Sequence, residues 1–146
     1  MLNHEPESRL DCNEVLKNPY FWNSKQKLKF LQEVNNLIIA DNYFRQLMIS
    51  KFPLLSKPWY TLIDERMWQY LIKYSNYNIQ STLDIVRLIR NVNEHWNELR
   101  FQEFSLDLFK AKREGFWKYI ASIFPDLLVD IYMAVHSLNY LYKFTV

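Results

Sequence analysis

Three residues near the end of one segment, Arg90, Asn91 and His95, are of types that can do chemistry on a phosphodiester. An imidazole moves a proton near neutral pH, and a guanidinium and an amide can hold a phosphate. Cleavage of a strand by a neighbouring hydroxyl, without a metal, needs one group that takes a proton, one that returns it to the leaving oxygen, and donors that stabilise the charge. The simpler alternative is a surface helix on which the three side chains are only solvated, since such trios also occur by accident.

The segment that carries these residues, 81–96, is predicted to be an amphipathic helix. Ser81 followed three residues later by Asp84 resembles a capping box, which is typical of a helix start. The two phosphate-binding candidates lie near the other end, and the imidazole lies about one turn beyond them. The apolar residues at helical spacing near one face are Leu83, Val86, Ile89 and Val92.

Most of the remaining chain also shows helical spacing, and no segment alternates with period two for long. Ser24 is the expected cap of the first helix, Pro53 and Pro58 bracket a loop, and Pro125 opens the last helix. We therefore predict an all-α fold. The expected helices cover residues 24–38, 41–52, 59–74, 81–96, 116–123 and 125–138, with a less regular, charged stretch over 97–114.

The composition indicates one globular domain and excludes several kinds of site. The chain has 146 residues, of which 49% are hydrophobic and 17% aromatic, enough for a sizeable core. The single glycine, Gly115, excludes a glycine-rich phosphate loop and a dinucleotide-binding fingerprint. The single cysteine, Cys12, excludes an internal disulfide and a cysteine-based zinc site.

Charge and hydropathy narrow the expectations further. The formal net charge of +2 is small for a general polyanion binder. The three histidines, His4, His95 and His136, are far apart in the sequence and form no i, i+4 ligand pair. This does not exclude a metal, but nothing in the sequence indicates one, and we expect no small-molecule cofactor. No run approaches the ~18 apolar residues that span a bilayer, and no signal-peptide pattern is present. We therefore expect a cytoplasmic domain without membrane contact.

Three separated blocks of the sequence are Pro19–Trp22 with 27–34, the segment 88–95, and 124–128 with Tyr132. They resemble, in the same order and at similar intervals, the kinase-extension nuclease (KEN) domain. This domain follows the kinase-like part of ribonuclease L and of the ER-membrane stress-sensor kinase/ribonuclease. The resemblance covers roughly residues 18 to 140, and its motifs are specific.

The resemblance implies a compact helical endoribonuclease that needs no metal and acts as a homodimer on single-stranded or loop RNA. Its products would carry 2′,3′-cyclic phosphate and 5′-hydroxyl ends. His95 would donate or accept a proton, while Arg90 and Asn91 would contact the scissile phosphate. Glu94 precedes His95 as in ribonuclease L, which favours RNA decay over the stress-sensor role.

Three further positions match functional residues of the family. Tyr77 lies where the stress-sensor branch has a catalytic tyrosine and could act as a base beside a guanidinium, or it could simply pack in an aromatic-rich loop. Tyr140 falls where ribonuclease L has a functionally important tyrosine, although its aromatic neighbours favour ordinary packing equally well. Asp84 matches a family acid, for which a capping or structural role is the better interpretation.

A basic cluster follows the candidate helix and comprises Lys110, Lys112, Arg113 and Lys118. It could contact RNA electrostatically, although such clusters are usually only solvated.

We interpret residues 1–17 as a remnant of the last helices of a kinase-like C-lobe and residues 18–146 as the KEN domain. Besides the enzyme, two alternatives stay open. The first is a non-catalytic KEN-like module that forms a heterodimer with a full-length homologue. The second is a helical RNA-binding domain without catalysis.

Overall fold

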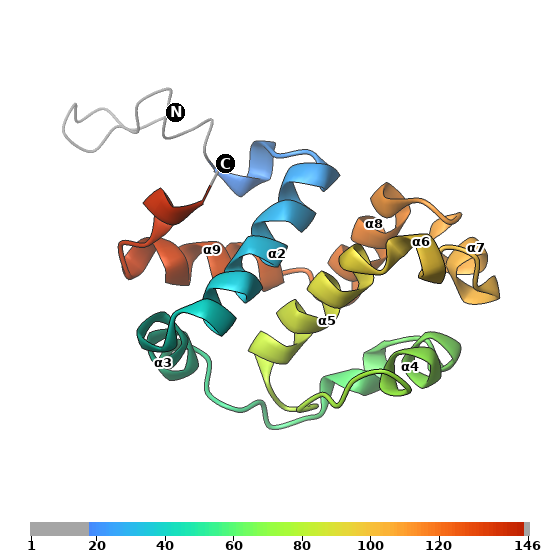
Figure 1. Ribbon diagram of the computed structural model, residues 1–146, viewed down its shortest axis with the longest axis horizontal. Helices are drawn as coiled ribbons and strands as arrows, with labels where there is room; N and C mark the ends of the chain where they lie inside the picture. The colour runs from blue at the N-terminus through green and yellow to red at the C-terminus, as the bar shows by residue number, and fades with distance from the viewer. Residues whose placement is uncertain (1–17, 145–146) are drawn as a thin grey trace.

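The computed structural model describes residues 18–144, which form helices and connecting segments without any strand. This confirms the predicted all-α class. Residues 1–17 lie outside the described part, so the kinase-like remnant and its boundary stay predictions. Figure 1 shows the helices, which are α2 (Ser24–Ala40), α3 (Asn42–Lys51), α4 (Glu65–Ile72), α5 (Thr82–Glu94), α6 (Trp96–Leu99), α7 (Glu103–Phe109), α8 (Arg113–Ile123) and α9 (Leu127–Ser137), with 3-10 helices η2 (Pro19–Phe21), η3 (Trp59–Leu62) and η4 (Leu141–Lys143).

The first helix begins one residue earlier than its expected cap implied. Asn23, not Ser24, is the N-cap of α2. The Asn23 side chain accepts a hydrogen bond from the Gln26 backbone at 2.8 Å, and the Gln26 side chain accepts one from the Asn23 backbone at 2.9 Å. This reciprocal pair satisfies two backbone donors at the helix start, which a serine one position later does not do.

The predicted single helix over residues 59–74 is wrong, because the segment is broken in the middle. It consists of η3 and α4, separated by Ile63 in an extended conformation. Asp64 caps α4 by accepting a hydrogen bond from the Arg66 backbone at 2.9 Å, and the Asp64 backbone donates to the Tyr119 hydroxyl of α8 at 2.8 Å. The break therefore depends on a contact with a distant helix that the apolar spacing of the segment does not reveal.

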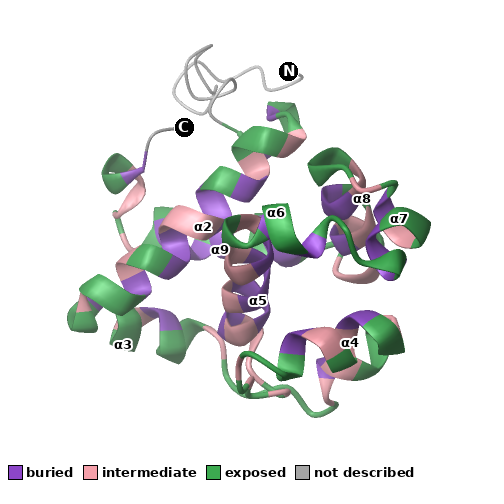
Figure 2. Cartoon of the chain, turned by 45° about the vertical axis from the view of Figure 1, so that its right-hand side comes forward, coloured by how far each residue is buried: buried purple, intermediate pink, exposed green. Residues whose placement is uncertain are grey.

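Helix α5 lies in the middle of the molecule, with other helices around it (Figure 2). It makes its most extensive contact with α2, which also contacts α3, α8 and α9. The four apolar residues predicted to face inward are all buried, and Ile85 and Leu88 are buried as well. Because α5 is enclosed on more than one face, its polar side chains are confined to a few positions.

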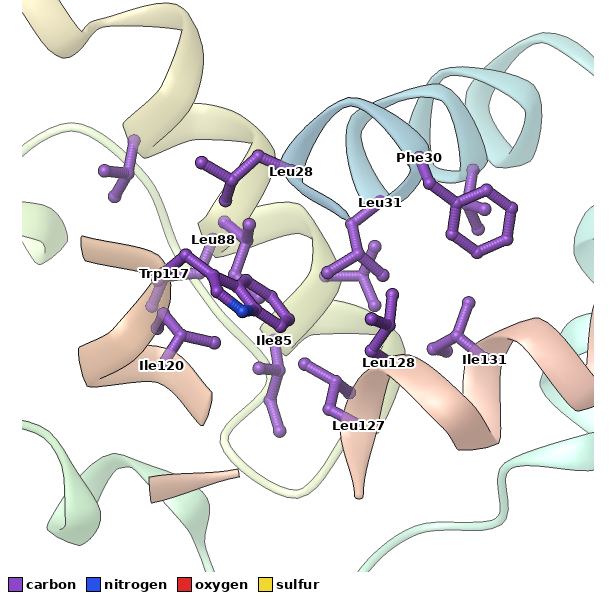
Figure 3. Packing of buried hydrophobic residues seen from close by; sticks show 14 of the residues in the cluster. Leu28, Phe30, Leu31, Ile85, Leu88, Trp117, Ile120, Leu127, Leu128 and Ile131 are labelled. Atoms are coloured by element: carbon purple, nitrogen blue, oxygen red, sulfur yellow. The ribbon is translucent and has the colours of Figure 1, made fainter. Parts of the chain in front are cut away.

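The centre of the core holds α5 against α2, α8 and α9. Figure 3 shows Leu31, Leu88 and Ile120, from three of these helices, among the buried side chains that point toward one another. Burying one such side chain stabilises the fold by about 1.5–3 kcal/mol relative to leaving it exposed. Apolar packing therefore fixes the position of α5 independently of its polar residues.

Helices α8 and α9 both contribute to this core, with Phe116, Ile120 and Ile131 almost inaccessible to solvent. Within residues 18–144, no single helix is long and apolar enough to cross a bilayer. Helices α8 and α9 reach that length and composition only together, across a bend of 85°.

The connection between α7 and α8 is unusually tight. Lys110 and Ala111 both adopt left-handed backbone conformations, with φ of 55° and 53°. The end of α7 and the first turn of α8 thereby come so close that a Cβ added at Gly115 would lie 2.1 Å from the Phe109 carbonyl oxygen. The only glycine of the chain is therefore required here by close approach of two backbone segments.

Candidate active site

One pocket of about 340 Å³ brings together four residues that the sequence singled out, namely Tyr77, Arg90, Asn91 and His95. Arg90 and Asn91 come from the last turn and a half of α5, His95 from the residue that ends it, and Tyr77 from the loop before it. The rest of the pocket wall is formed by Tyr70, Leu71, Tyr74, Ser75, Val92, Glu98 and Leu99. Sequence spacing gave no sign of Tyr70, Tyr74 or Glu98, because they belong to other elements.

A chain of hydrogen bonds links three of the four residues. The Arg90 guanidinium donates from Nη1 to the Asn91 side-chain oxygen at 3.1 Å, and the Asn91 amide nitrogen donates to the Tyr77 hydroxyl at 2.9 Å. Because the Tyr77 oxygen accepts this bond, its own O–H proton is available to a substrate oxygen. The three polar groups are thus held in one orientation relative to each other before any ligand binds.

His95 occupies the C-cap position of α5, and its backbone N–H donates to the Asn91 carbonyl at 3.0 Å. Its side chain is exposed and lines the pocket. No side chain in residues 18–144 hydrogen-bonds the imidazole, so neither ring nitrogen is occupied by a partner from the described part of the chain. This leaves the imidazole free to donate or accept a proton.

The Tyr77 ring packs in an aromatic cluster while its hydroxyl reaches the pocket. Its ring centroid lies 6.2 Å from that of Trp59 and 6.0 Å from that of Trp68. The Arg87 guanidinium lies 4.6 Å from the Tyr77 ring centroid. Tyr77 therefore both packs in an aromatic cluster and lines the candidate site.

The loop that carries Tyr77 is anchored from behind the pocket. The Asp84 carboxylate accepts a hydrogen bond from the Asn78 backbone at 2.6 Å. The Trp59 indole N–H donates to the carbonyls of Asn78 and Ser81, at 3.1 and 3.0 Å. Asp84 is also bonded through its backbone to the capping Ser81 side chain at 3.3 Å, but its carboxylate holds the loop instead of closing a capping box.

Trp59 was missed by sequence reasoning. It is 2% exposed and lies 22 residues from Ser81, so no local pattern connects the two. Only the packing of η3 beside the start of α5 shows that its indole supports the Tyr77 loop.

Replacing Asp84 by alanine is expected to cost about 1–3 kcal/mol of unfolding free energy, because the Asn78 N–H loses its acceptor. Denaturant unfolding measures this loss, and Asp84→Asn, which keeps one acceptor oxygen, should lose less. If Tyr77 takes part in catalysis, the rate of RNA cleavage should also fall, because the loop that carries Tyr77 loses its contact with Asp84. Full stability of Asp84→Ala combined with loss of cleavage would instead indicate a direct chemical role for the carboxylate.

Tyr140 does not line the pocket. It follows α9 and packs against Phe44 of α3, with ring centroids 4.7 Å apart, and against Tyr142 at 6.4 Å. Within one chain the structure therefore does not bring Tyr140 together with the four pocket residues.

The basic cluster is divided between two places. Lys110 and Lys112 line a separate hollow of about 470 Å³ beside α7 and α8. Arg113 instead donates from Nε to the Asn93 side-chain oxygen at 3.0 Å and from Nη2 to the Asn93 carbonyl at 3.3 Å. A guanidinium bonded to a carbonyl near the end of α5 stabilises that helix terminus. Arg113 thus has a structural role, whether or not it contacts RNA.

Among residues 18–144, no three His, Cys, Asp or Glu side chains are grouped as a metal site would require. Glu98 lines the pocket, and Glu94 forms an ion pair with Arg90 at 3.1 Å.

Comparison with known proteins decides the family. A family model described as Ribonuclease 2-5A matches residues 27–145, which is most of the chain. The chain belongs to this family. The KEN-domain resemblance seen in the three sequence blocks is thereby confirmed.

The relatives of this ribonuclease 2-5A domain include two plant proteins named serine/threonine-protein kinase/endoribonuclease. IRE1a of Arabidopsis thaliana is 32% identical over 143 residues, covering 92% of this chain and 16% of its own length. IRE1 of Oryza sativa subsp. japonica is 30% identical over 135 residues, covering 90% of this chain and 15% of its own length. The ribonuclease 2-5A domain thus spans about one sixth of these relatives.

A third relative bears on whether the ribonuclease 2-5A domain is active. It is named inactive serine/threonine-protein kinase/endoribonuclease IRE1-like, from Arabidopsis thaliana, and is 25% identical over 149 residues, covering 90% of this chain and 27% of its own length. Membership of the family alone therefore does not establish catalysis, and the chemistry of the pocket has to support it.

Proposed function

We propose that the chain is a metal-independent endoribonuclease domain that cleaves single-stranded or loop RNA. The observation that carries this proposal is the pocket in which Tyr77, Asn91 and Arg90 form one hydrogen-bonded chain beside His95. A phosphate-binding guanidinium, an orienting amide and two groups able to move a proton lie together there. Membership of the ribonuclease 2-5A family supports RNA as the substrate.

In the proposed reaction, the 2′-hydroxyl of RNA attacks the adjacent phosphorus, forming one P–O bond while the bond to the 5′-oxygen breaks. The products are a 2′,3′-cyclic phosphate and a 5′-hydroxyl. One of His95 and Tyr77 takes the 2′-hydroxyl proton and the other returns a proton to the leaving 5′-oxygen. Arg90 stabilises the charge on the phosphate, and Asn91 orients Arg90 and Tyr77.

We further propose that the active form is a homodimer. The resemblance implies it, and the separation of Tyr140 from the pocket within one chain agrees with a site that a second protomer would complete. The rate per protomer is then expected to rise with protein concentration, because dimers form by mass action. Initial cleavage rates with EDTA throughout, measured beside the molar mass from light scattering over a wide concentration range, check this. A constant rate per protomer from a protein that stays monomeric would contradict the dimer.

The second candidate is a non-catalytic module that pairs with a full-length kinase-like homologue. The observation that favours this second candidate is the relative from Arabidopsis thaliana that is named inactive. Co-purification with such a homologue, together with no cleavage by the folded chain at any concentration, would replace the first proposal by the second.

Two RNA substrates separate the branches of the family. Glu94 before His95 favours a ribonuclease L-like role in RNA decay, whereas the quoted relatives carry the kinase/endoribonuclease name. We propose the decay role. It predicts faster cleavage of an unstructured uridine-rich strand than of a defined stem-loop, and the opposite preference would indicate stress-linked RNA processing.

A further inference from the structure

Glu94 forms an ion pair with Arg90, the residue to which the proposed function assigns the substrate phosphate. Its Oε2 lies 3.1 Å from Nη2 of Arg90, one helical turn earlier on α5. Carboxylates and phosphates bind a guanidinium in the same way, through oxygen atoms that accept from its N–H groups. A phosphate that approaches Arg90 therefore meets an anion already in place.

Arg90 is held on its other sides by neutral groups. Nε donates to the Asn36 side-chain oxygen of α2 at 3.3 Å, and Nη1 donates to Asn91 at 3.1 Å. These amides orient the guanidinium without reducing its charge. Glu94 is thus the one group in contact with Arg90, among the described residues, that neutralises it.

Glu94 can leave Arg90 without losing every partner. Its other oxygen, Oε1, accepts a hydrogen bond from Gln32 Nε2 of α2 at 3.4 Å. The Gln32 side chain is in turn fixed by Asn93, whose amide donates to it at 2.5 Å. The side chains of Arg90 and Glu94 are 26% and 33% exposed, so water reaches the pair and separating it costs little.

We propose that Glu94 is a built-in counter-ion of Arg90 that competes with the RNA phosphate and so weakens substrate binding. This inference rests on the proposed function, since it assigns a regulator to the same phosphate site. When RNA binds, the phosphate takes the place of the Glu94 carboxylate on Arg90, and Glu94 stays beside α2 through Gln32. No covalent bond is made or broken in this exchange.

The test compares Glu94→Gln with a matched control, Glu114→Gln. Glu114 also forms an ion pair with a residue four positions away, Lys118 at 3.4 Å, and its loss changes the net charge equally. The two glutamates differ in their partner, because Glu94 pairs with Arg90 and Glu114 pairs with Lys118. Affinity is measured with a short single-stranded RNA that carries 2′-O-methyl groups at every position and cannot be cleaved, and thermal unfolding shows that each variant is folded.

Glu94→Gln is expected to bind this RNA about fivefold more tightly than Glu114→Gln at low salt, since one charge repulsion at contact distance is removed. The slope of affinity against salt should also steepen, by up to ~0.7, because Arg90 then neutralises a phosphate without leaving a carboxylate unpaired. On cleavable RNA, KM should fall while kcat changes little. Equal affinities and slopes for the two variants, or no binding by either, would overturn the proposal.

A role for Glu94 in orienting Arg90 would give a different result. Glu94→Gln would then lower kcat, with RNA binding unchanged or weaker, and that outcome also overturns the counter-ion proposal. Cleavage of unmodified RNA by the original sequence is scored separately. If the original sequence cleaves no RNA while Glu94→Gln binds RNA more tightly, the proposed catalytic function is wrong. The proposal that Glu94 competes with the RNA phosphate for Arg90 is then still supported.

Discussion

His95→Ala is expected to lower the rate of EDTA-resistant RNA cleavage by about 10²–10⁴-fold, the usual contribution of a positioned acid or base. The imidazole is exposed and lines the pocket, with no side-chain hydrogen bond to the described part of the chain, so its loss removes a proton carrier and little else. Stability should stay within about 0.5 kcal/mol of the original, as for other exposed positions. Single-turnover cleavage of a labelled uridine-rich strand measures the rate, and denaturant unfolding measures the stability.

His136→Ala is the matched control for this experiment. His136 is also an exposed histidine near a helix C-terminus, but it lies on α9 and stacks on Tyr132 at 6.3 Å. The His136→Ala variant should cleave RNA at the same rate as the original sequence. Equal residual cleavage by both variants would show that the observed activity does not come from the proposed site, and a contaminating ribonuclease would then be the first explanation to test.

Gly115→Ala is expected to destabilise the fold by about 3 kcal/mol or more, at the upper end of overpacking effects. The added Cβ would lie 2.1 Å from the Phe109 carbonyl oxygen and 2.8 Å from its carbon, which are backbone atoms that cannot turn aside. Alanine inside a helix normally stabilises by about 0.5–1 kcal/mol relative to glycine, so a loss would reverse the usual sign. The midpoint of urea unfolding, followed by circular dichroism, measures the change.

Lys118→Ala tests whether the loss of stability in Gly115→Ala is specific to the close approach of Gly115 to Phe109. Lys118 lies on the same helix α8, is exposed, and makes only a surface ion pair with Glu114. Its replacement should change stability by no more than about 0.5 kcal/mol. An unchanged or higher stability of Gly115→Ala would mean that the α7–α8 connection opens at little cost.

The parts of the fold governed by local spacing were predicted well. The capping serine and the apolar face of α5 follow from residues three or four apart, and the structure has both. The cap of α2 was misplaced by one residue, from Asn23 to Ser24. The break between η3 and α4 was missed because it depends on a distant partner. The break at Ile63 requires the Tyr119 hydroxyl, 55 residues from Asp64, and apolar spacing continues unchanged across it.

The candidate site divides in the same way. Arg90, Asn91 and His95 share one helix end, so their proximity could be predicted from the sequence alone. The contacts of Arg90 with Asn36, 54 residues away, and of Asn91 with Tyr77 depend on how α2 and a loop pack on α5. Resemblance to a family suggested Tyr77 and Tyr140 equally, whereas the packing of a single chain places only Tyr77 in the pocket.

The indole cluster behind the site gives the protein a natural optical probe. Trp59 and Trp68 lie edge to face with centroids 5.6 Å apart, and both are within 6.2 Å of the Tyr77 ring. Aromatic rings at such separations couple electronically, so their near-ultraviolet circular dichroism and the transfer of excitation from tyrosine to tryptophan depend on their mutual orientation. Movement of the Tyr77 loop when RNA enters the pocket would therefore alter the protein's own spectrum, without any attached label.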